Sequence, residues 1–548
     1  MLSMRLLYSI LLALISVWSL QGQDEKSGYL ILESHLPIVS IRTYNQAIPD
    51  EPKIEAKMAI IQNDKGETNT LQALFSSYPM HIGIEMRGES SQYFYPKKSY
   101  GIETRDSLGE NLNISVLGLP EENDWILYGP YGDKTMIRNA LVYELAGKIM
   151  EWSPTLVYCE LVINNNYQGV YLFGEKIKRD KNRVDIAKLL EKDSVGNDLT
   201  GGYIIKIDKG ERNYINGWYS NYLPTPTSTQ RIFYQYHYPK PEEITLKQRN
   251  YIKSYMNVVE RSLYDDDFLD PDKGYKSNFD VASFIDYFLL NEISRNVDGY
   301  RLSTFLYKDK DNTDGRLKIG PVWDYNLGFG NANYCNGFDH AGWAYKHNET
   351  CRNDYWSVPF WWEKLMEDPA FKNKLKTRWV ELREGIFHKD SIMQIIDSKA
   401  ETMGAAVARN FSIWPILGRW VWPNYAVGNT YDEELDELKR WISYRLTWMD
   451  YNMPGIQIST GTEEFAYELI VEAYPNPFDE YIIINGPIQP TEELRLQVFS
   501  TSGRLVQEQK IRSFPTRISL NHQNSGFYYF SIHNKHGLIF YRGKMIKN

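Results

Sequence analysis

The sequence lacks the short motifs that would assign a chemistry at once. Its 548 residues contain no GxxxxGK[ST] loop, no GxGxxG after the first strands, no HExxH and no GxSxG. The first two absences remove the usual glycine-rich phosphate loops. The other two argue against a zinc hydrolase and a serine hydrolase built on a nucleophile elbow.

Cysteine is also scarce, with only three residues and no CxxC pair. This argues against a structural zinc site of the common spacing. Cys159 lies in the apolar run LVYCELVI, which is typical of a buried thiol. Cys335 and Cys351 flank a 15-residue loop. In an exported chain they could form a disulfide, but the sequence alone leaves that pairing open.

Long hydrophobic runs are nearly absent. The exception starts after Arg5 and covers residues 6–20, which is shorter than the roughly 20 residues that span a bilayer. We interpret residues 1–22 as a signal peptide, with an N-terminal membrane anchor as the alternative. The formal net charge of −9 argues against a nucleic-acid partner. We therefore expect an exported protein with no membrane span after signal cleavage.

The apolar pattern changes from strand-like to helical along the chain, and then back. Residues 133–150 interrupt the first β-rich part with a predicted helix, for which Asp133 is the expected N-cap, and Asp280 is expected to cap a later helix. The order predicts an α+β fold with two lobes and a cleft between them. The expected units are a β-rich lobe at 28–240, a helical lobe at 241–453, a linker at 454–470 and a small β-sandwich at 471–548.

The C-terminal unit resembles the sorting domain of proteins exported by the type IX secretion system. The resemblance rests on YPNPF (474–478), LQVFSTSGRLV (496–506), SGFYYFSI (525–532) and the terminal RGKMIKN, in that order. An Ig-like adhesion module is the alternative. The resemblance implies the type IX machinery as a partner, passage through the periplasm, and a final place in the medium or on the cell surface.

Residues from about 35 to 450 resemble the CotH (spore-coat protein H) kinase-like family. Six ordered segments carry the resemblance, among them MRGESSQYFYPKKSYGIETRD at 86–106, FIDYFLLNEISRNVDGYRLSTFLYKDKD at 284–311 and GRLKIGPVWDYNLGFGN at 315–331. The family implies an atypical protein-kinase-like two-lobe fold. It also implies phosphoryl transfer with ATP and Mg²⁺ or Mn²⁺ as cofactors.

Two aspartates fit the acidic roles of such an enzyme. Asp324 follows the apolar pair Val322 and Trp323, where an unpaired carboxylate is unfavourable unless it binds a cation. Its position before a glycine-containing turn is similar to that of the kinase metal-binding Asp, with Asn326 as a second candidate ligand. The resemblance assigns Asp298 as the catalytic acid. Structural alternatives are a capping acid for Asp324 and turn residues for Asp298 and Asn326.

The sequence gives weaker signals for phosphate-binding residues than for the two aspartates. The resemblance favours Lys98 as the lysine that binds nucleotide phosphates, with Glu144 as its carboxylate partner and Arg138 as a further phosphate ligand. For each of these side chains the alternative is an ordinary surface ion pair. The segment RGESS (87–91) is the candidate loop for phosphate, or else a plain turn.

Three functions remain in contention. The first is an exported ATP- and metal-dependent kinase acting on protein Ser/Thr, including its own chain. The second is an inactive kinase-shaped scaffold on the cell surface, which the missing glycine loop and the departure of residues 324–326 (Asp-Tyr-Asn) from the kinase DFG segment both favour. Ser303 stands where the kinase loop has its Asn, so a second metal ligand is not provided there. The third is carbohydrate binding through the aromatic-rich residues 334–362, which could equally form core.

Overall fold

The computed structural model describes residues 32–63, 67–71, 79–210, 212–455, 471–486, 494–533 and 539–548. The predicted signal peptide lies outside these residues, as does most of the predicted linker. Within the described part of the chain, no helix combines the length and apolar character needed to cross a membrane.

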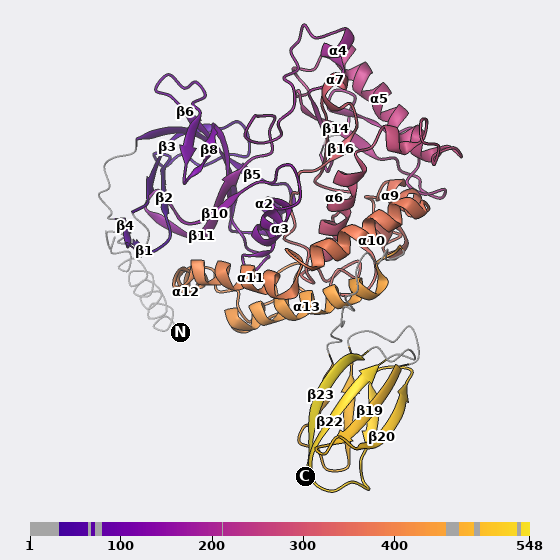
Figure 1. Cartoon of the computed structure of the whole chain (residues 1–548). Helices are drawn as coiled ribbons and strands as arrows, with labels where there is room; N and C mark the ends of the chain where they lie inside the picture. The colour runs from indigo at the N-terminus through magenta and orange to yellow at the C-terminus, as the bar shows by residue number, and fades with distance from the viewer. Residues whose placement is uncertain are drawn as a thin grey trace, which may run out of the picture.

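A closed barrel forms the first part of the fold (Figure 1, indigo). Its strands follow the order β10-β11-β9-β6-β5-β3-β2, and all pair antiparallel except β2 with β10. Alternate residues such as Ile82, Ile84 and Ile102 point inward, where Trp125 and Tyr171 fill the interior. The strands are β2 (Ile38–Arg42), β3 (Ile54–Ile61), β5 (Met80–Arg87), β6 (Ser99–Arg105), β9 (Asp124–Tyr128), β10 (Leu156–Ile163) and β11 (Asn166–Glu175).

Smaller elements decorate the barrel, namely the pairs β1 (Leu32–Ser34) with β4 (Asn69–Leu71) and β7 (Ile114–Val116) with β8 (Leu119–Glu122), and the helix α2 (Ser90–Phe94).

The helix α3 (Arg138–Ala146) is shorter than the one predicted over 133–150. Asp133 is not its N-cap; the carboxylate accepts hydrogen bonds from the amides of Thr135 and Arg138 in the preceding turn. All residues of α3 except Glu144 are buried. Tertiary packing on every side, rather than one apolar stripe, therefore stabilises this helix.

A second sheet has the order β13-β14-β12-β15-β16, with antiparallel pairing throughout. The strands β12–β14 precede the lobe boundary expected near residue 240, whereas β15 and β16 follow it. The hydrogen bonds of one sheet thus join residues on either side of that boundary. The strands are β12 (Tyr203–Ile207), β13 (Gly217–Tyr219), β14 (Phe233–Tyr238), β15 (Thr304–Lys308) and β16 (Lys318–Ile319).

Helices pack around this sheet and reach back to the barrel. The helix α6 is apolar on nearly every face and almost entirely buried, and Asp280 caps it as predicted, accepting a 2.8 Å bond from the Ser283 amide. The helix α12 touches β11 of the barrel, where Asn410 accepts a bond from buried Lys97. The longer helices are α5 (Leu246–Tyr264), α6 (Val281–Ser294), α10 (Pro369–Arg383), α11 (Lys389–Met403), α12 (Ala406–Ile413) and α13 (Tyr431–Asn452).

Short helical turns complete this region: α4 (Gly196–Leu199), η1 (Tyr275–Ser277), α7 (Asp311–Asp314), η2 (Ala344–Lys346), α8 (His347–Thr350) and α9 (Trp361–Leu365).

The C-terminal module consists of two antiparallel sheets around their own core (Figure 1, yellow). One has the order β17-β18-β21 and the other β20-β19-β22-β23. The predicted mixed α+β class with a C-terminal β-rich region is therefore confirmed. The strands are β17 (Glu472–Tyr474), β18 (Tyr481–Asn485), β19 (Leu494–Ser500), β20 (Leu505–Ile511), β21 (Thr516–Ser519), β22 (Gly526–His533) and β23 (Ile539–Lys547).

Candidate functional site

A cavity of ≈ 640 Å³ is lined by the barrel, the second sheet and the segments that follow α6 and β16. Its lining is rich in aromatic side chains and includes four aspartates. The polar and charged lining residues include Arg87, Ser90, Ser91, Lys206, Asp208, Lys209, Asp298, Arg301, Asp324, Asn326 and Asp354.

Three of these aspartates, Asp208, Asp298 and Asp324, come from separate parts of the sequence. Asp208 directly follows β12, Asp298 follows the end of α6, and Asp324 lies five residues after β16. The sequence-predicted pair, Asp298 and Asp324, thus shares one cavity with Asn326. Asp208 is a third acid that the sequence reasoning did not single out.

The backbone holds Asp324 in an unusual conformation. Its φ of 66° lies in the left-handed region, which residues other than glycine adopt only when their surroundings compensate for the strain. Here the Asp324 amide donates to the Tyr143 hydroxyl at 3.2 Å, and its carbonyl accepts from Asn296 at 3.1 Å. The next amide, of Tyr325, donates to Asn139 at 2.6 Å. These bonds aim the Asp324 side chain into the cavity.

The Asp324 carboxylate accepts no hydrogen bond from any residue in the described ranges. Its side chain is open to the cavity, yet the protein walls around it still displace much of its hydration. This burial, together with the charges of Asp298 and Asp208, raises the pKa of Asp324 to about 6, against the opposing charges of Arg87 and Lys209. The site is therefore short of positive charge, which a bound cation would supply.

Asp298 is held in place by its neighbour in the following turn. The Arg301 guanidinium, which is 2 % exposed, donates to one Asp298 oxygen at 2.7 Å and to the Val297 carbonyl at 2.8 Å. Another nitrogen of Arg301 lies 3.3 Å from Asp354. Arg301 thus bridges two carboxylates and leaves the second oxygen of Asp298 without a hydrogen bond from the described residues.

Cationic groups also line the cavity. The ammonium of Lys206 lies 3.3 Å from Asp208, and that of Lys209 donates to the Ser90 hydroxyl at 2.8 Å. The Arg87 guanidinium stacks over the Trp323 ring at 5.1 Å, and burial lowers the pKa of Arg87. These groups are placed to receive an anionic ligand beside the three acids.

The segment 87–91 lines the cavity along its whole length. Gly88 has φ +90°, and a Cβ at this position would lie 2.2 Å from the Ser91 hydroxyl oxygen. Only glycine fits such a turn without displacing Ser91. The candidate phosphate loop therefore faces the cavity, and its role in binding phosphate stays a prediction.

The other sequence-predicted residues lie outside the cavity lining. The Lys98 ammonium donates to the carbonyls of Gln92 and Tyr95, so it braces α2. The Arg138 guanidinium pairs with Asp133 at 2.6 Å and donates to the carbonyl of Gly328, and thus supports the turn after Asp324. Glu144 forms a surface ion pair with Lys399 at 2.6 Å. Each side chain is engaged with protein groups rather than aimed at a ligand.

The sequence contains one pattern that could have identified the cavity residues that the sequence analysis missed. Lys206 and Asp208 stand two residues apart at the end of the run GGYIIKIDK, so a strand places both on one face. Arg87 likewise ends β5. Charged residues at the ends of otherwise apolar strands can therefore locate this part of the site. Arg301 has no such signal, because its role depends on the turn geometry.

The aromatic-rich region 334–362 serves two purposes. Tyr334 and Trp356 line the cavity. Trp361 and Trp362, each 1 % exposed, lie in the main core, and Trp343 packs against it. Only part of this region can therefore contact a ligand.

Comparison with known proteins identifies two segments. Residues 84–449 match the family model described as "CotH kinase protein", which is well over half of the chain. Residues 472–548 match the model described as "Secretion system C-terminal sorting domain". No curated protein matches the chain.

Proposed function

The chain belongs to the CotH kinase protein family and carries a type IX secretion sorting domain, and we propose that it is an exported ATP- and metal-dependent phosphotransferase. Its acceptor in this proposal is a Ser or Thr hydroxyl of a protein, including its own chain. The sorting domain indicates secretion to the cell surface or the extracellular space. Because ATP is scarce there, the reaction is expected to take place before the protein leaves the cell.

One observation supports this proposal most directly. Asp298 and Asp324 are 26 residues apart in the sequence, yet both line one cavity, and the charge of Asp298 contributes to the raised pKa of Asp324. Phosphoryl transfer needs a carboxylate for the metal ion and a second carboxylate for the attacking hydroxyl. The arrangement provides both on one side of a shared space.

The residues present fit a divalent cation with a nucleotide. The free carboxylate of Asp324 and the side-chain oxygen of Asn326 are oxygen donors of the kind that Mg²⁺ or Mn²⁺ takes. Lys206, Lys209 and the amides of the 87–91 segment would hold the phosphates. When bound, the cation neutralises the charge that develops on the transferred phosphoryl group. The protein's own contribution is to fix the positions of these oxygens.

Asp298 would orient the acceptor hydroxyl and accept its proton. Because Arg301 occupies one oxygen of Asp298, the remaining oxygen is the one that can face the hydroxyl. Arg301 acts as a positioning residue, since it holds Asp298 through a 2.7 Å bond on one side and Asp354 on the other.

An inactive scaffold that binds a nucleotide without turnover is the second candidate. The same ion pair favours it, because Arg301 occupies one of the two Asp298 oxygens that could accept a proton. In addition, Ser303 lines the cavity where the kinase loop would place an Asn metal ligand.

Labelled ATP distinguishes the two functions. Purified chain would be incubated with [γ-³²P]ATP and Mg²⁺ or Mn²⁺, alone and with a mixture of candidate protein acceptors, and nucleotide binding would be measured in parallel. Transfer that disappears in both Asp298→Asn and Asp324→Asn supports the phosphotransferase. The matched control is Asp390→Asn, whose side chain is 86 % exposed at the start of α11. Binding without transfer in the wild type selects the scaffold, and neither binding nor transfer contradicts both.

A further inference from the structure

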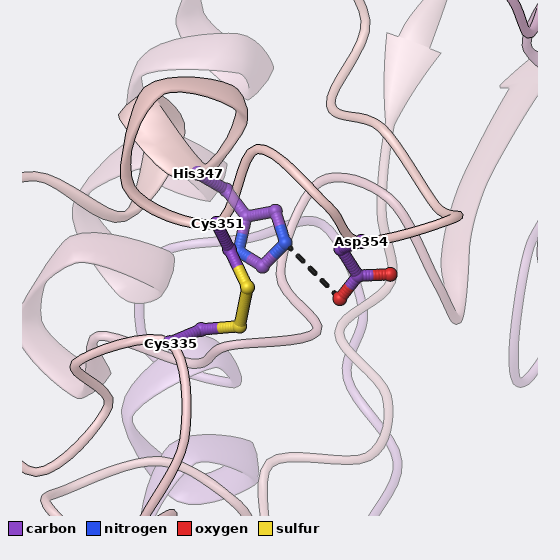
Figure 2. Close-up of side chains that lie close together, drawn as sticks. All are labelled: Cys335, His347, Cys351 and Asp354. Atoms are coloured by element: carbon purple, nitrogen blue, oxygen red, sulfur yellow. Dashed lines mark ion pairs between the residues drawn. A yellow bond between two sulfur atoms is a disulfide. The ribbon is translucent and has the colours of Figure 1, made fainter.

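One cluster of metal-ligating side chains lies beside the cavity. In the described residues, Cys335, His347, Cys351 and Asp354 are the only group of three or more His, Cys, Asp or Glu whose ligand atoms all lie within 4.8 Å of one another. Figure 2 shows the imidazole and the carboxylate facing each other next to the two sulfurs. The sulfurs are joined in a disulfide, with the Cα atoms 5.3 Å apart. This confirms a pairing that the sequence left open.

The buried imidazole of His347 is a second observation that indicates a ligand at this cluster. Its side chain is 6 % exposed, and its Nε2 atom has no hydrogen-bond partner among the described residues. The nearest acidic atom is an Asp354 oxygen at 3.4 Å, which is the ion pair drawn in Figure 2. A neutral imidazole with an unpaired ring nitrogen is the form that binds transition metals.

Asp354 supplies a carboxylate oxygen to the cluster. This oxygen lies 3.4 Å from the His347 Nε2 atom and 3.3 Å from the Arg301 guanidinium. With two cysteines, one histidine and one aspartate, the group has the four ligands and the soft donors that Zn²⁺ takes in tetrahedral sites.

We propose that Cys335, His347, Cys351 and Asp354 bind Zn²⁺ when the disulfide is reduced. One dithiol reductant converts the disulfide to two thiols and is itself oxidised to a disulfide. Zn²⁺ then displaces the two thiol protons, which are released to solvent. Two thiolates, the Asp354 carboxylate, the Arg301 guanidinium and Zn²⁺ sum to zero charge. The disulfide form excludes the metal, because both sulfurs are bonded to each other.

The two redox states would act differently on the cavity. In the disulfide form described here, Asp354 lies 3.3 Å from Arg301, which holds Asp298. Zn²⁺ would compete with Arg301 for the same Asp354 oxygen, because that oxygen also faces His347. Metal binding would therefore loosen the support of Arg301. This zinc site is a property of the four side chains and does not depend on the phosphotransferase proposal.

Cobalt spectroscopy tests the site without any activity measurement. Full-length protein would be reduced with a phosphine under nitrogen, desalted and titrated with Co²⁺. We expect about one equivalent to bind, with a thiolate-to-cobalt band in the near ultraviolet and visible bands of tetrahedral Co²⁺ that Zn²⁺ abolishes. The oxidised protein should show neither. A reduced wild-type chain that gives no such bands, folded or not, overturns the proposal.

Three variants identify the ligands. The double variant Cys335→Ser/Cys351→Ser should lose the thiolate band, and His347→Ala should weaken Co²⁺ binding at least about tenfold. The control is Cys159→Ser, because Cys159 is buried within the barrel and belongs to a different cluster. A band that persists in the double variant would place the metal at another thiol and contradict the assignment.

Discussion

Asp324 and Asp354 line the same cavity but have opposite surroundings. Asp354 accepts a 3.0 Å bond from the Trp356 amide and faces Arg301 and His347, which lower its pKa to about 2. Asp324 has no hydrogen-bond donor on its carboxylate among the described residues, and burial and like charges raise its pKa to about 6. The protein provides partners for the carboxylate of Asp354 and none, among the described residues, for that of Asp324. This difference supports Asp324, and not Asp354, as the proposed metal ligand of the phosphotransferase.

The largest expected effect comes from neutralising the two aspartates separately. We predict that Asp324→Asn lowers phosphoryl transfer about a thousandfold, because a charge that holds the metal in the transition state is removed. Asp354→Asn should lower it about tenfold at most, since its effect passes through Arg301. Steady-state rates with saturating Mg²⁺ would measure both. Equal losses in the two variants would remove the distinction between a ligand-binding and a structural acid.

Arg301 pairs with Asp354 and also with Asp298, whose charge contributes to the raised pKa of Asp324. Its substitution should therefore alter the surroundings of both aspartates that are compared. We predict that Arg301→Gln lowers the free energy of unfolding by about 3 kcal/mol, because two largely buried carboxylates lose their shared partner. Denaturant unfolding followed by tryptophan fluorescence would measure this. The control Arg316→Gln removes an arginine that is 45 % exposed and should change stability by less than about 1 kcal/mol.

The different surroundings of the cavity aspartates also show which site residues the sequence could predict. Asp324 stands out in the sequence because a charged residue follows an apolar stretch, whereas Asp298 is singled out by the family resemblance. The α+β class and the Asp280 cap follow from periodicity. These two features and the position of Asp324 depend only on local pattern.

The local sequence pattern does not predict where a side chain points, as the positions of Lys98, Arg138 and Glu144 show. A lysine on a strand looks the same whether its ammonium reaches a ligand or, like that of Lys98, nearby carbonyls. The helix limits around Arg138 were also misplaced, because packing on all sides replaced the expected apolar stripe. Side-chain direction depends on tertiary neighbours, which a single sequence does not contain.

Lysine substitutions test which cationic side chain binds the nucleotide phosphates. We predict that Lys209→Met weakens ATP binding about tenfold, because its ammonium lines the cavity beside Ser90. Lys98→Met is the matched variant and should change ATP affinity less than twofold, although it should destabilise α2. Isothermal titration with a non-hydrolysable ATP analogue would measure both. The reverse ranking would restore Lys98 as the phosphate-binding lysine.

The smallest expected effect is a pH dependence of stability with opposite signs for the two aspartates. Because the folded pKa of Asp324 is raised to about 6 from 3.8, the folded state binds the proton more tightly, and stability falls as the pH rises from about 4 to 6. Asp354 has a lowered folded pKa of about 2, so its contribution is present above pH 4 and is lost below it.

Thermal unfolding midpoints between pH 4.5 and 7.5 isolate the Asp324 contribution, because Asp354 stays ionised throughout that window. Subtracting the Asp324→Asn curve from the wild-type curve should leave a midpoint difference that grows more negative toward pH 6 and is flat above pH 7. Since the Asp324 side chain is open to cavity water, we expect less than about 1 kcal/mol. Added Mg²⁺ should abolish the difference above pH 6 by supplying the missing positive charge. A difference that is independent of both pH and Mg²⁺ would mean that Asp324 is already satisfied within the protein.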